Sequence, residues 1–235
     1  MSPKEPGSLH LAALPLGVVV LVSGGGSNLQ ALIDAQQGGL EIAIRAVVSN
    51  VAGVFALERA RIAGIPGLVL DHRDFASRED YDAALAELID GYDPGLLVLA
   101  GFMRILTPGF VSRYRGRMLN IHPSLLPKFR GLHTHSRALE AGERVHGASV
   151  HFVTAELDGG PVVLQAEVPV LPGDDPERLA ARVLELEHQI YPCVVGWLAA
   201  GRLELDAADR PVLDGKRLTR PLLLGSDGQC PNPPD

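Results

Sequence analysis

Short apolar runs alternate with amphipathic segments along the first half of the chain. The run GVVVLV over residues 17–22 is rich in β-branched residues and predicts a strand covered on both faces. Residues 28–37 follow with apolar positions at helical spacing. The later segments repeat this alternation, with strands predicted over 41–49, 67–70 and 96–100, and helices over 55–63 and 78–92. This order predicts an open, mostly parallel sheet with helices on both faces, a three-layer α/β/α doubly wound fold.

The second half of the chain changes character and predicts antiparallel strands. A very short strand over 118–121 leads into the stretch HPSLLPKFRGLHTH. Two strands over 148–155 and 162–170 are joined through LDGGP, which is typical of a hairpin-like connection. A long helix is predicted over 177–200, despite Pro192 near its end. The sheet is therefore expected to be mostly parallel, with antiparallel strands in its C-terminal half.

We expect residues 17–218 to form a single domain, because neither an internal repeat nor a low-complexity linker interrupts them. Residues 1–16 contain prolines without an amphipathic period, and residues 219–235 end in CPNPPD, so both predict loose tails. The turn-like LLPKF segment also predicts a cis peptide bond before Pro127.

Composition narrows the choice of partner and compartment. Lys plus Arg total 21 against 28 Asp plus Glu, so a net charge of -7 provides no generally basic surface for nucleic acid or acidic lipid. No apolar run approaches the roughly 18 residues that span a bilayer. Residues 11–22 imitate a secretory signal but lack its flanking charge and cleavage site. Cys193 and Cys230 form neither a ligand pattern nor a disulfide framework, and we expect a cytoplasmic protein.

The loop SGGGSN lies between the first predicted strand and the first predicted helix. Glycine lets the backbone approach a ligand closely, and Ser27 and Asn28 present donors at the positive end of a helix, where a phosphate binds. A dinucleotide fingerprint needs a glycine where Leu29 stands, and the Walker A sequence Gly-Lys-Ser/Thr does not occur. The loop therefore suits a single phosphate, with a tight turn that binds no ligand as the alternative.

Five of the eight histidines lie close together in the second half: His122, His133, His135, His146 and His151. A metal site is the first hypothesis, because His133 and His135 could chelate an ion. The segment has no cysteine, no H-E-x-x-H sequence and no carboxylate one helical turn from a histidine pair. We therefore expect no metal; histidines with satisfied hydrogen bonds in loops are the alternative, which we favour for His146.

Asn120 and His122 end the short strand of the second half, directly before Pro123. Residues two apart in a strand point to the same side, so we expect both to face one pocket at the carboxyl end of the strand, where open α/β sheets bind ligands. An Asn amide suits a developing oxyanion, and a histidine transfers protons near neutral pH. A capping Asn and a core His are the alternative.

Asp158 lies in the turn LDGGP. An aspartate in such a turn commonly serves the turn alone. If the turn folds over the end of the sheet, its carboxylate lies near His122 and favours the charged imidazole. Spacing along the chain leaves both interpretations open.

Several motifs in register resemble one family. The stretches GFMRIL, NIHPSLLPKFRGLHTH and HGASVHFVTAELDGGPVVLQ are similar to those of the glycinamide ribonucleotide formyltransferases, the folate enzymes of purine synthesis. SGGGSN resembles the SGxGSN loop of that family, and Glu187-His188 with Tyr191-Pro192 resembles its C-terminal helix. The likeness runs in order from about residue 17 to about residue 218.

The resemblance implies direct transfer of the formyl group of 10-formyltetrahydrofolate, the co-substrate, to the amine of glycinamide ribonucleotide through a tetrahedral intermediate. Asn120 and His122 of the NxHPS motif and Asp158 of the LDGG turn match the catalytic residues of the family. In this interpretation Asn120 and protonated His122 stabilise the oxyanion, and Asp158 holds the charge and orientation of His122.

The binding residues of the family map in the same way. Its phosphate loop corresponds to Gly26, Ser27 and Asn28, and its ribonucleotide-contacting glutamate to Glu187. Leu184 stands where some members carry a basic residue, so phosphate binding is expected to depend more on the loop. The folate-binding positions correspond to Arg78, Met103, Arg104, Ile105, Leu106 and Asn120.

Other users of 10-formyltetrahydrofolate remain alternatives. Methionyl-tRNA formyltransferases share a similar SLLPxxRG stretch, sugar-nucleotide formyltransferases and deformylases use the same donor, and a non-catalytic folate or nucleotide sensor would share the fold. The chain stops at Asp235 with a net charge of -7, and 16 residues precede the first strand, so we expect neither a basic tRNA-binding domain nor a regulatory N-terminal domain. The expected partners are the two small substrates, without nucleic acid or membrane, as a monomer or homodimer.

Overall fold

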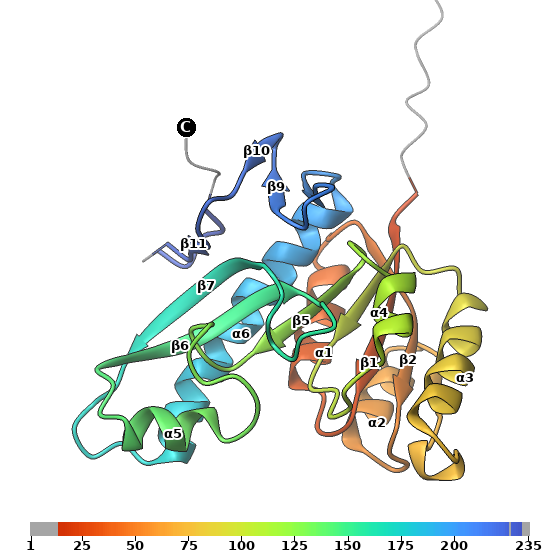
Figure 1. The fold of residues 1–235 in the computed structure, drawn as a ribbon, viewed down its shortest axis with the longest axis horizontal. Coiled ribbons are helices and arrows are strands. Elements are labelled where there is room, and N and C mark those ends of the chain that lie inside the picture. The colour runs from red at the N-terminus through yellow and green to blue at the C-terminus, as the bar shows by residue number, and fades with distance from the viewer. Residues whose placement is uncertain (1–13, 226, 232–235) are drawn as a thin grey trace, which may run out of the picture.

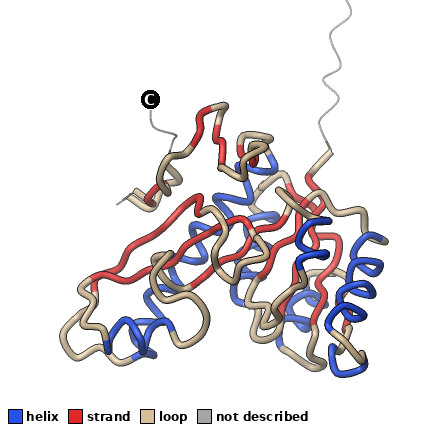
Figure 2. The backbone as a smooth tube through the Cα atoms, viewed as in Figure 1, coloured by secondary structure: helices blue, strands red, loops and turns tan. Residues whose placement is uncertain are grey.

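The computed structural model describes residues 14–225 and 227–231 of the chain. Its main feature is an eight-stranded sheet with the order β11-β7-β6-β5-β4-β1-β2-β3, which runs between helices (Figure 1, Figure 2). The elements of the first half are β1 (Leu16–Val22), α1 (Ser27–Gln37), β2 (Ile42–Ser49), α2 (Phe55–Ile62), β3 (Gly67–Val69), η1 (His72–Asp74), α3 (Arg78–Asp90) and β4 (Leu96–Leu99). Because β1 pairs in parallel with both β2 and β4, the predicted fold class is confirmed for this half.

The other end of the sheet contains antiparallel strands, as predicted, although its outermost strand, β11, pairs in parallel with β7. β5 pairs in parallel with β4, whereas β6 pairs antiparallel with both β5 and β7. A separate three-stranded sheet, β10-β9-β8, follows the long helix α6. The elements of this half are α4 (Pro108–Arg113), β5 (Met118–His122), α5 (Thr134–Glu140), β6 (Val145–Phe152), β7 (Val162–Pro169), α6 (Pro176–Ala199), β8 (Leu203–Leu205), β9 (Pro211–Leu213), β10 (Lys216–Arg217) and β11 (Leu222–Leu223).

Helices cover both faces of the parallel strands. Val18 and Val20 of β1 belong to one apolar cluster, with residues of α1, α2 and α6. Val19 and Leu21 belong to a second cluster, with residues of α3 and α4. Because alternate residues of a strand point to opposite faces, one uninterrupted apolar run contributes to both clusters.

The long helix α6 is tied to the strands that lead toward the candidate site. Tyr191 is fully buried, and its hydroxyl oxygen lies 2.9 Å from the carbonyl oxygen of Leu99 and 3.0 Å from that of Leu119. These carbonyl groups belong to β4 and β5. Pro192 lies inside the helix, as predicted.

The C-terminal segment departs from the prediction of a loose tail over residues 219–235. Leu222 and Leu223 form β11 beside β7, and the N–H of Leu224 donates to the carbonyl of Gln165 over 2.8 Å. Without β11, the outer edge of β7 would present unpaired backbone groups, and a returning segment can satisfy them. This pairing depends on the tertiary fold, so the short Leu-rich sequence of this segment does not predict it.

The expectation that the two cysteines form no disulfide is wrong. Cys193 of α6 and Cys230 are bonded, and their Cα atoms lie 6.0 Å apart. The chain returns to α6 after β11, which brings together two residues separated by 37 positions in the sequence.

Residues 1–13 of the predicted N-terminal tail lie outside the described residues, as do residues 226 and 232–235. The peptide bond between Leu126 and Pro127 is cis, as predicted. Within the part of the chain that the structure describes, no helix combines the length and the apolar character needed to cross a membrane.

Candidate active site

Three connecting segments meet at the carboxyl edge of the parallel strands. They follow β1, β4 and β5 and comprise residues 23–26, 100–107 and 123–133. In the sheet, β1 lies between β4 and β2, so the strand order reverses at the boundary between β1 and β4. Open α/β sheets bind their ligands at such a switch point.

The loop after β1 leads directly into the start of α1. Gly26 has a φ of 71°, and a Cβ added there would lie 2.6 Å from the Cβ of Ala56, so this turn requires glycine. Ser27 then begins α1, whose first N–H groups form the positive end of the helix. The predicted phosphate residues Gly26, Ser27 and Asn28 therefore lie together at one helix end.

Asn28 and Glu187 form a buried pair between α1 and α6. Asn28 Nδ2 donates to Glu187 Oε2 over 2.7 Å, and the two residues are 8% and 7% exposed. Burial raises the pKa of Glu187, and the hydrogen bond from Asn28 opposes that shift. Asn28 Oδ1 has no hydrogen-bond partner among the described residues. An unpaired acceptor beside a carboxylate is suited to hydroxyl groups of a ligand.

The segment after β4 lines a largely apolar cleft. The N–H of Met103 donates to Ser23 Oγ over 2.8 Å, which ties this segment to the loop after β1. The N–H of Thr107 donates to the buried carboxylate of Asp82 over 2.6 Å. Arg78 and Met103 are exposed, and neither lines the cleft that the described residues form. The other predicted folate-binding residues do line it: Arg104, Ile105, Leu106 and Asn120.

Asn120 stands opposite His151 in the antiparallel pair of β5 and β6. Directly opposed residues present their side chains on the same face of the sheet. Asn120 Nδ2 lies 3.0 Å from His151 Nε2. His151 is 2% exposed, and its Nδ1 lies 2.9 Å from the carbonyl oxygen of Phe152.

His122 is held by the backbone of the loop that follows it. Its Nε2 lies 3.0 Å from the carbonyl oxygen of Phe129, and because a carbonyl oxygen only accepts, Nε2 carries a proton. Its Nδ1 lies 3.5 Å from Asp158 Oδ2, and both side chains are nearly buried. The structure therefore places the carboxylate of the LDGG turn beside this histidine.

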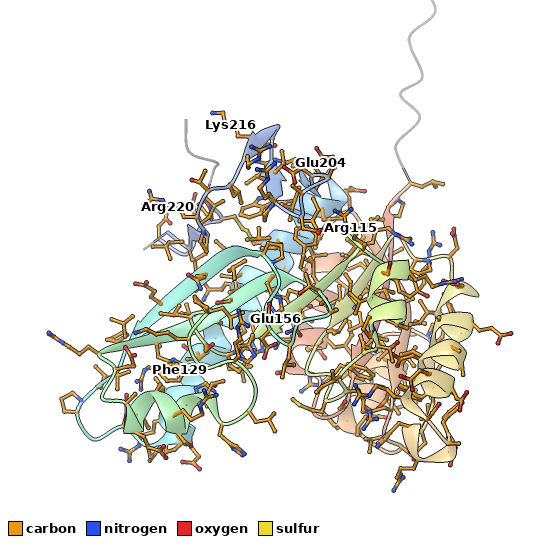
Figure 3. The ribbon with its side chains drawn as sticks, viewed as in Figure 1. Arg115, Phe129, Glu156, Glu204, Lys216 and Arg220 are labelled. Carbon is orange, nitrogen blue, oxygen red and sulfur yellow. A yellow bond between two sulfur atoms is a disulfide. The ribbon has the colours of Figure 1, made fainter. Side chains whose placement is uncertain are left out.

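Two loops hold Asp158 in position. The N–H of Gly131 donates to Asp158 Oδ2 over 2.8 Å, and Asp158 Oδ1 lies 3.9 Å from His151 Nε2. Nearer the solvent, Arg130 and Glu156 form an ion pair between the same two loops, and Figure 3 labels Glu156 on its loop. The three predicted catalytic side chains thus converge from β5 and from the connection between β6 and β7.

Both loops contain non-glycine residues with a left-handed backbone. The φ angle is 55° at Phe129 and 47° at Asp158. Such conformations cost about 1–3 kcal/mol each and concentrate at functional sites. Phe129 presents its carbonyl oxygen to one side of the His122 ring, and Asp158 presents its carboxylate to the other. The strain is therefore located where it orients this histidine.

Two other histidines of this region, His135 of α5 and His146 of β6, pack against each other. The rings of His135 and His146 meet edge to face, with centroids 5.2 Å apart. Burial lowers the pKa of both side chains, that of His146 to about 4. Within residues 14–225 and 227–231, no group of three or more His, Cys, Asp or Glu side chains is arranged to hold a metal ion.

Sequence reasoning did not assign three groups that shape the site. These are the side chain of His151, the carbonyl of Phe129 and the N–H of Gly131. The antiparallel pairing of the two strands could have pointed to His151, because it stands opposite Asn120. The sequence cannot indicate the roles of the two backbone groups, because nearly every residue type has the same backbone N–H and carbonyl groups.

Comparison with known proteins gives consistent matches. The model of the formyl transferase family matches residues 16–195. The chain is 58% identical over 204 residues to phosphoribosylglycinamide formyltransferase of Escherichia coli strain K12, covering 86% of this chain and 96% of that protein. It is 47% identical to the protein of the same name from Haemophilus influenzae, with the same coverage. Among solved structures, phosphoribosylglycinamide formyltransferase from Coxiella burnetii has a TM-score of 0.85 and 55% identity, covering 88% of this chain and 99% of that one.

Proposed function

The chain belongs to the formyl transferase family, and we propose that it transfers the formyl group of 10-formyltetrahydrofolate to the amine of 5'-phosphoribosylglycinamide in de novo purine biosynthesis. The observation that carries this proposal is the convergence of Asn120, His122 and Asp158 at the carboxyl edge of the sheet. The relatives that bear this name match the chain over nearly their whole length, which supports the same substrate pair.

Asn120 supplies a neutral hydrogen-bond donor for the formyl oxygen. As the substrate amine attacks the formyl carbon, negative charge develops on that oxygen and a tetrahedral intermediate forms. A preorganised amide N–H at this position contributes about 10²–10³ in rate. Asn120 lines the cleft together with Arg104 and Leu106, so the donor faces the proposed folate site.

His122 and Asp158 assist the proton transfers of the reaction. The carbonyl of Phe129 fixes the proton on Nε2, so Nδ1 is the nitrogen that gains and loses a proton beside Asp158. The charged ring adds to the stabilisation of the oxyanion, and the carboxylate stabilises that charge. The proton released by the attacking amine is returned to the folate nitrogen that leaves. Such acid–base assistance contributes about 10²–10⁴ in rate.

The ribonucleotide binds across α1 and α6 in this proposal. Gly26, Ser27 and Asn28 present the positive end of α1 to the phosphate. Glu187 repels a phosphate but accepts hydrogen bonds from hydroxyl groups, so its buried carboxylate suits the ribose. Leu184 provides no cation, which leaves the phosphate to the loop and the helix end.

The folate occupies the cleft after β4 in this proposal. Ile105 and Leu106 offer apolar side chains, and the backbone of residues 104–106 offers polar groups, the combination that a flat heterocycle with edge donors and acceptors requires. Arg104 Nε is buried without a hydrogen-bond partner among the described residues, so a donor is available there. Arg78 is exposed at the start of α3 and is assigned to the charged tail of the folate.

The experiment that tests the proposal measures the folate product by absorbance. Purified protein with 10-formyltetrahydrofolate should form tetrahydrofolate only when 5'-phosphoribosylglycinamide is added. Ribose 5-phosphate, which lacks the amine, serves as the matched control and should give no product. Product without any amine would identify a deformylase, and the absence of product under all conditions would contradict the proposal.

A further inference from the structure

His151 is a buried titratable side chain to which the proposed reaction assigns no role. It lies on β6, is 2% exposed, and stands directly opposite Asn120 in the sheet. Its ring touches the polar groups of the site on one edge and the backbone of its own strand on the other.

The hydrogen-bond pattern determines the tautomer of this ring. Nδ1 lies 2.9 Å from the carbonyl oxygen of Phe152, and a carbonyl oxygen only accepts, so Nδ1 carries a hydrogen. In the neutral ring Nε2 is then an acceptor. Asn120 Nδ2 lies 3.0 Å from Nε2 and donates to it. The pairing therefore requires the nitrogen of the Asn120 amide, and not its oxygen, to face His151.

The surroundings of His151 keep the ring neutral. Burial lowers its pKa to about 4, and the nearby charges of His122 and Arg130 act in the same direction. The carbonyl of Phe152 and the carboxylate of Asp158, 3.9 Å from Nε2, oppose that shift without cancelling it. A charged ring would place an N–H against the N–H of Asn120, and the amide would have to turn over.

We propose that His151 is a positioning residue for the formyl transfer: as a neutral acceptor it fixes the Asn120 amide so that its second N–H remains available to an acceptor in the cleft. This inference rests on the proposed function, because the proposed function makes Asn120 the hydrogen-bond donor to the oxyanion, and His151 orients that donor. The terminal torsion of an Asn side chain is broad and nearly two-fold, so the amide has no strong orientation of its own. His151 supplies that orientation.

The first test compares two substitutions that differ in one property. His151→Gln keeps an acceptor oxygen, whereas His151→Leu keeps the bulk but removes the acceptor. We expect His151→Leu to lower kcat by about 10–10²-fold with little change in the folate dissociation constant, and His151→Gln to recover at least about tenfold of that loss. Equal kcat values for the two variants would overturn the inference, since a purely structural role would not depend on the acceptor.

The second test repeats His151→Leu in a chain that already carries Asn120→Ala. If His151 acts through Asn120, the added substitution should lower kcat by less than roughly twofold. If His151→Leu lowers kcat of the Asn120→Ala protein as much as it lowers kcat of the native protein, the inference is contradicted. Full activity of Asn120→Ala alone would instead contradict the proposed function, so the two failures are distinguishable.

The third test does not depend on activity or on variants that fold. Nitrogen-15 NMR of the histidine rings in the native protein at pH 7 should show His151 neutral, with hydrogen on Nδ1 and a bare Nε2. A charged ring, or hydrogen on Nε2, would overturn the proposal whatever the kinetics show.

Discussion

The proposed binding and catalytic parts of the site are built in different ways. In the binding part, Asn28 and Glu187 belong to two helices packed on the sheet, and their side chains meet over 2.7 Å in a buried contact. In the catalytic part, Asp158 depends on one N–H, that of Gly131, donated from one irregular loop to another. Packed helices resist displacement, whereas a loop is fixed by a few specific hydrogen bonds. Substitutions in the catalytic part should therefore change turnover with little loss of stability.

The largest effect is expected from the proposed catalytic residues. His122→Ala and Asp158→Asn should each lower turnover at least ~10²-fold, because the first removes the proton carrier and the second removes the charge that supports it. Circular dichroism and thermal unfolding should show an intact fold. Lys128→Gln, an exposed change in the same region, is the control and should keep its turnover. Near-normal turnover of either catalytic variant would refute the assignment.

A smaller effect is expected at the helix end of the binding part. Ser27→Asp places a carboxylate where the phosphate should lie and should raise KM for the ribonucleotide by about tenfold or more, with folate binding retained. An acidic residue in the first turn of a helix is favourable, so stability should not fall. Ser27→Asn is the neutral control of similar shape and should raise KM much less. Identical KM values for the two variants would argue against phosphate at this position.

Lowering the pH should reduce the free energy of unfolding through two buried histidines of β6. His146 and His151, both on β6, have pKa values lowered from 6.5 to about 4 by burial. Between these values the unfolded chain takes up protons that the folded chain excludes, so the free energy of unfolding decreases as pH falls from 6.5 toward 4. Above pH 6.5 both histidines are neutral in the folded and the unfolded chain, so their contribution to the free energy of unfolding is fully present.

His146→Gln isolates one of these groups, because it replaces a titrating side chain with a neutral one. Glu143 and the rings of His122 and His135 also act on this histidine, and the net result remains a lowered pKa. Melting temperatures at pH 7 and pH 5 should differ less in the variant than in the native chain. An equal difference in both proteins would show that His146 does not contribute.

The smallest effect is expected for the ion pair on the rim. Arg130 and Glu156 join the two catalytic loops, but their side chains are 39% and 65% exposed. An exposed pair of this kind is worth less than about 1 kcal/mol. Glu156→Gln should therefore reduce the free energy of unfolding by no more than that amount, measured by urea denaturation. A larger reduction would mean that the loops are held from their surface and not by the hydrogen bond to Asp158.

Local patterns in the sequence predicted the elements whose causes are local. The apolar run of β1 is buried on both faces, as its β-branched residues indicated. Ser77 precedes α3, and its Oγ accepts from the N–H of Asp80 over 3.1 Å, a helix cap that joins residues only three apart in the sequence. The short helices α4 and α5 and the sheet of β8–β10 were not predicted, because elements of a few residues depend on tertiary packing more than on propensity.

The sequence by itself determined the mostly parallel sheet and the placement of Asn120 and His122 on one strand, since strand periodicity and chain order are local properties. Only the tertiary structure decided which carboxylate reaches His122 and which acceptor faces Asn120. Asp158 and His151 arrive through antiparallel pairing and through loops with left-handed residues. Contacts of this kind join segments that are distant along the chain, and no local pattern of residue types encodes their distance or direction.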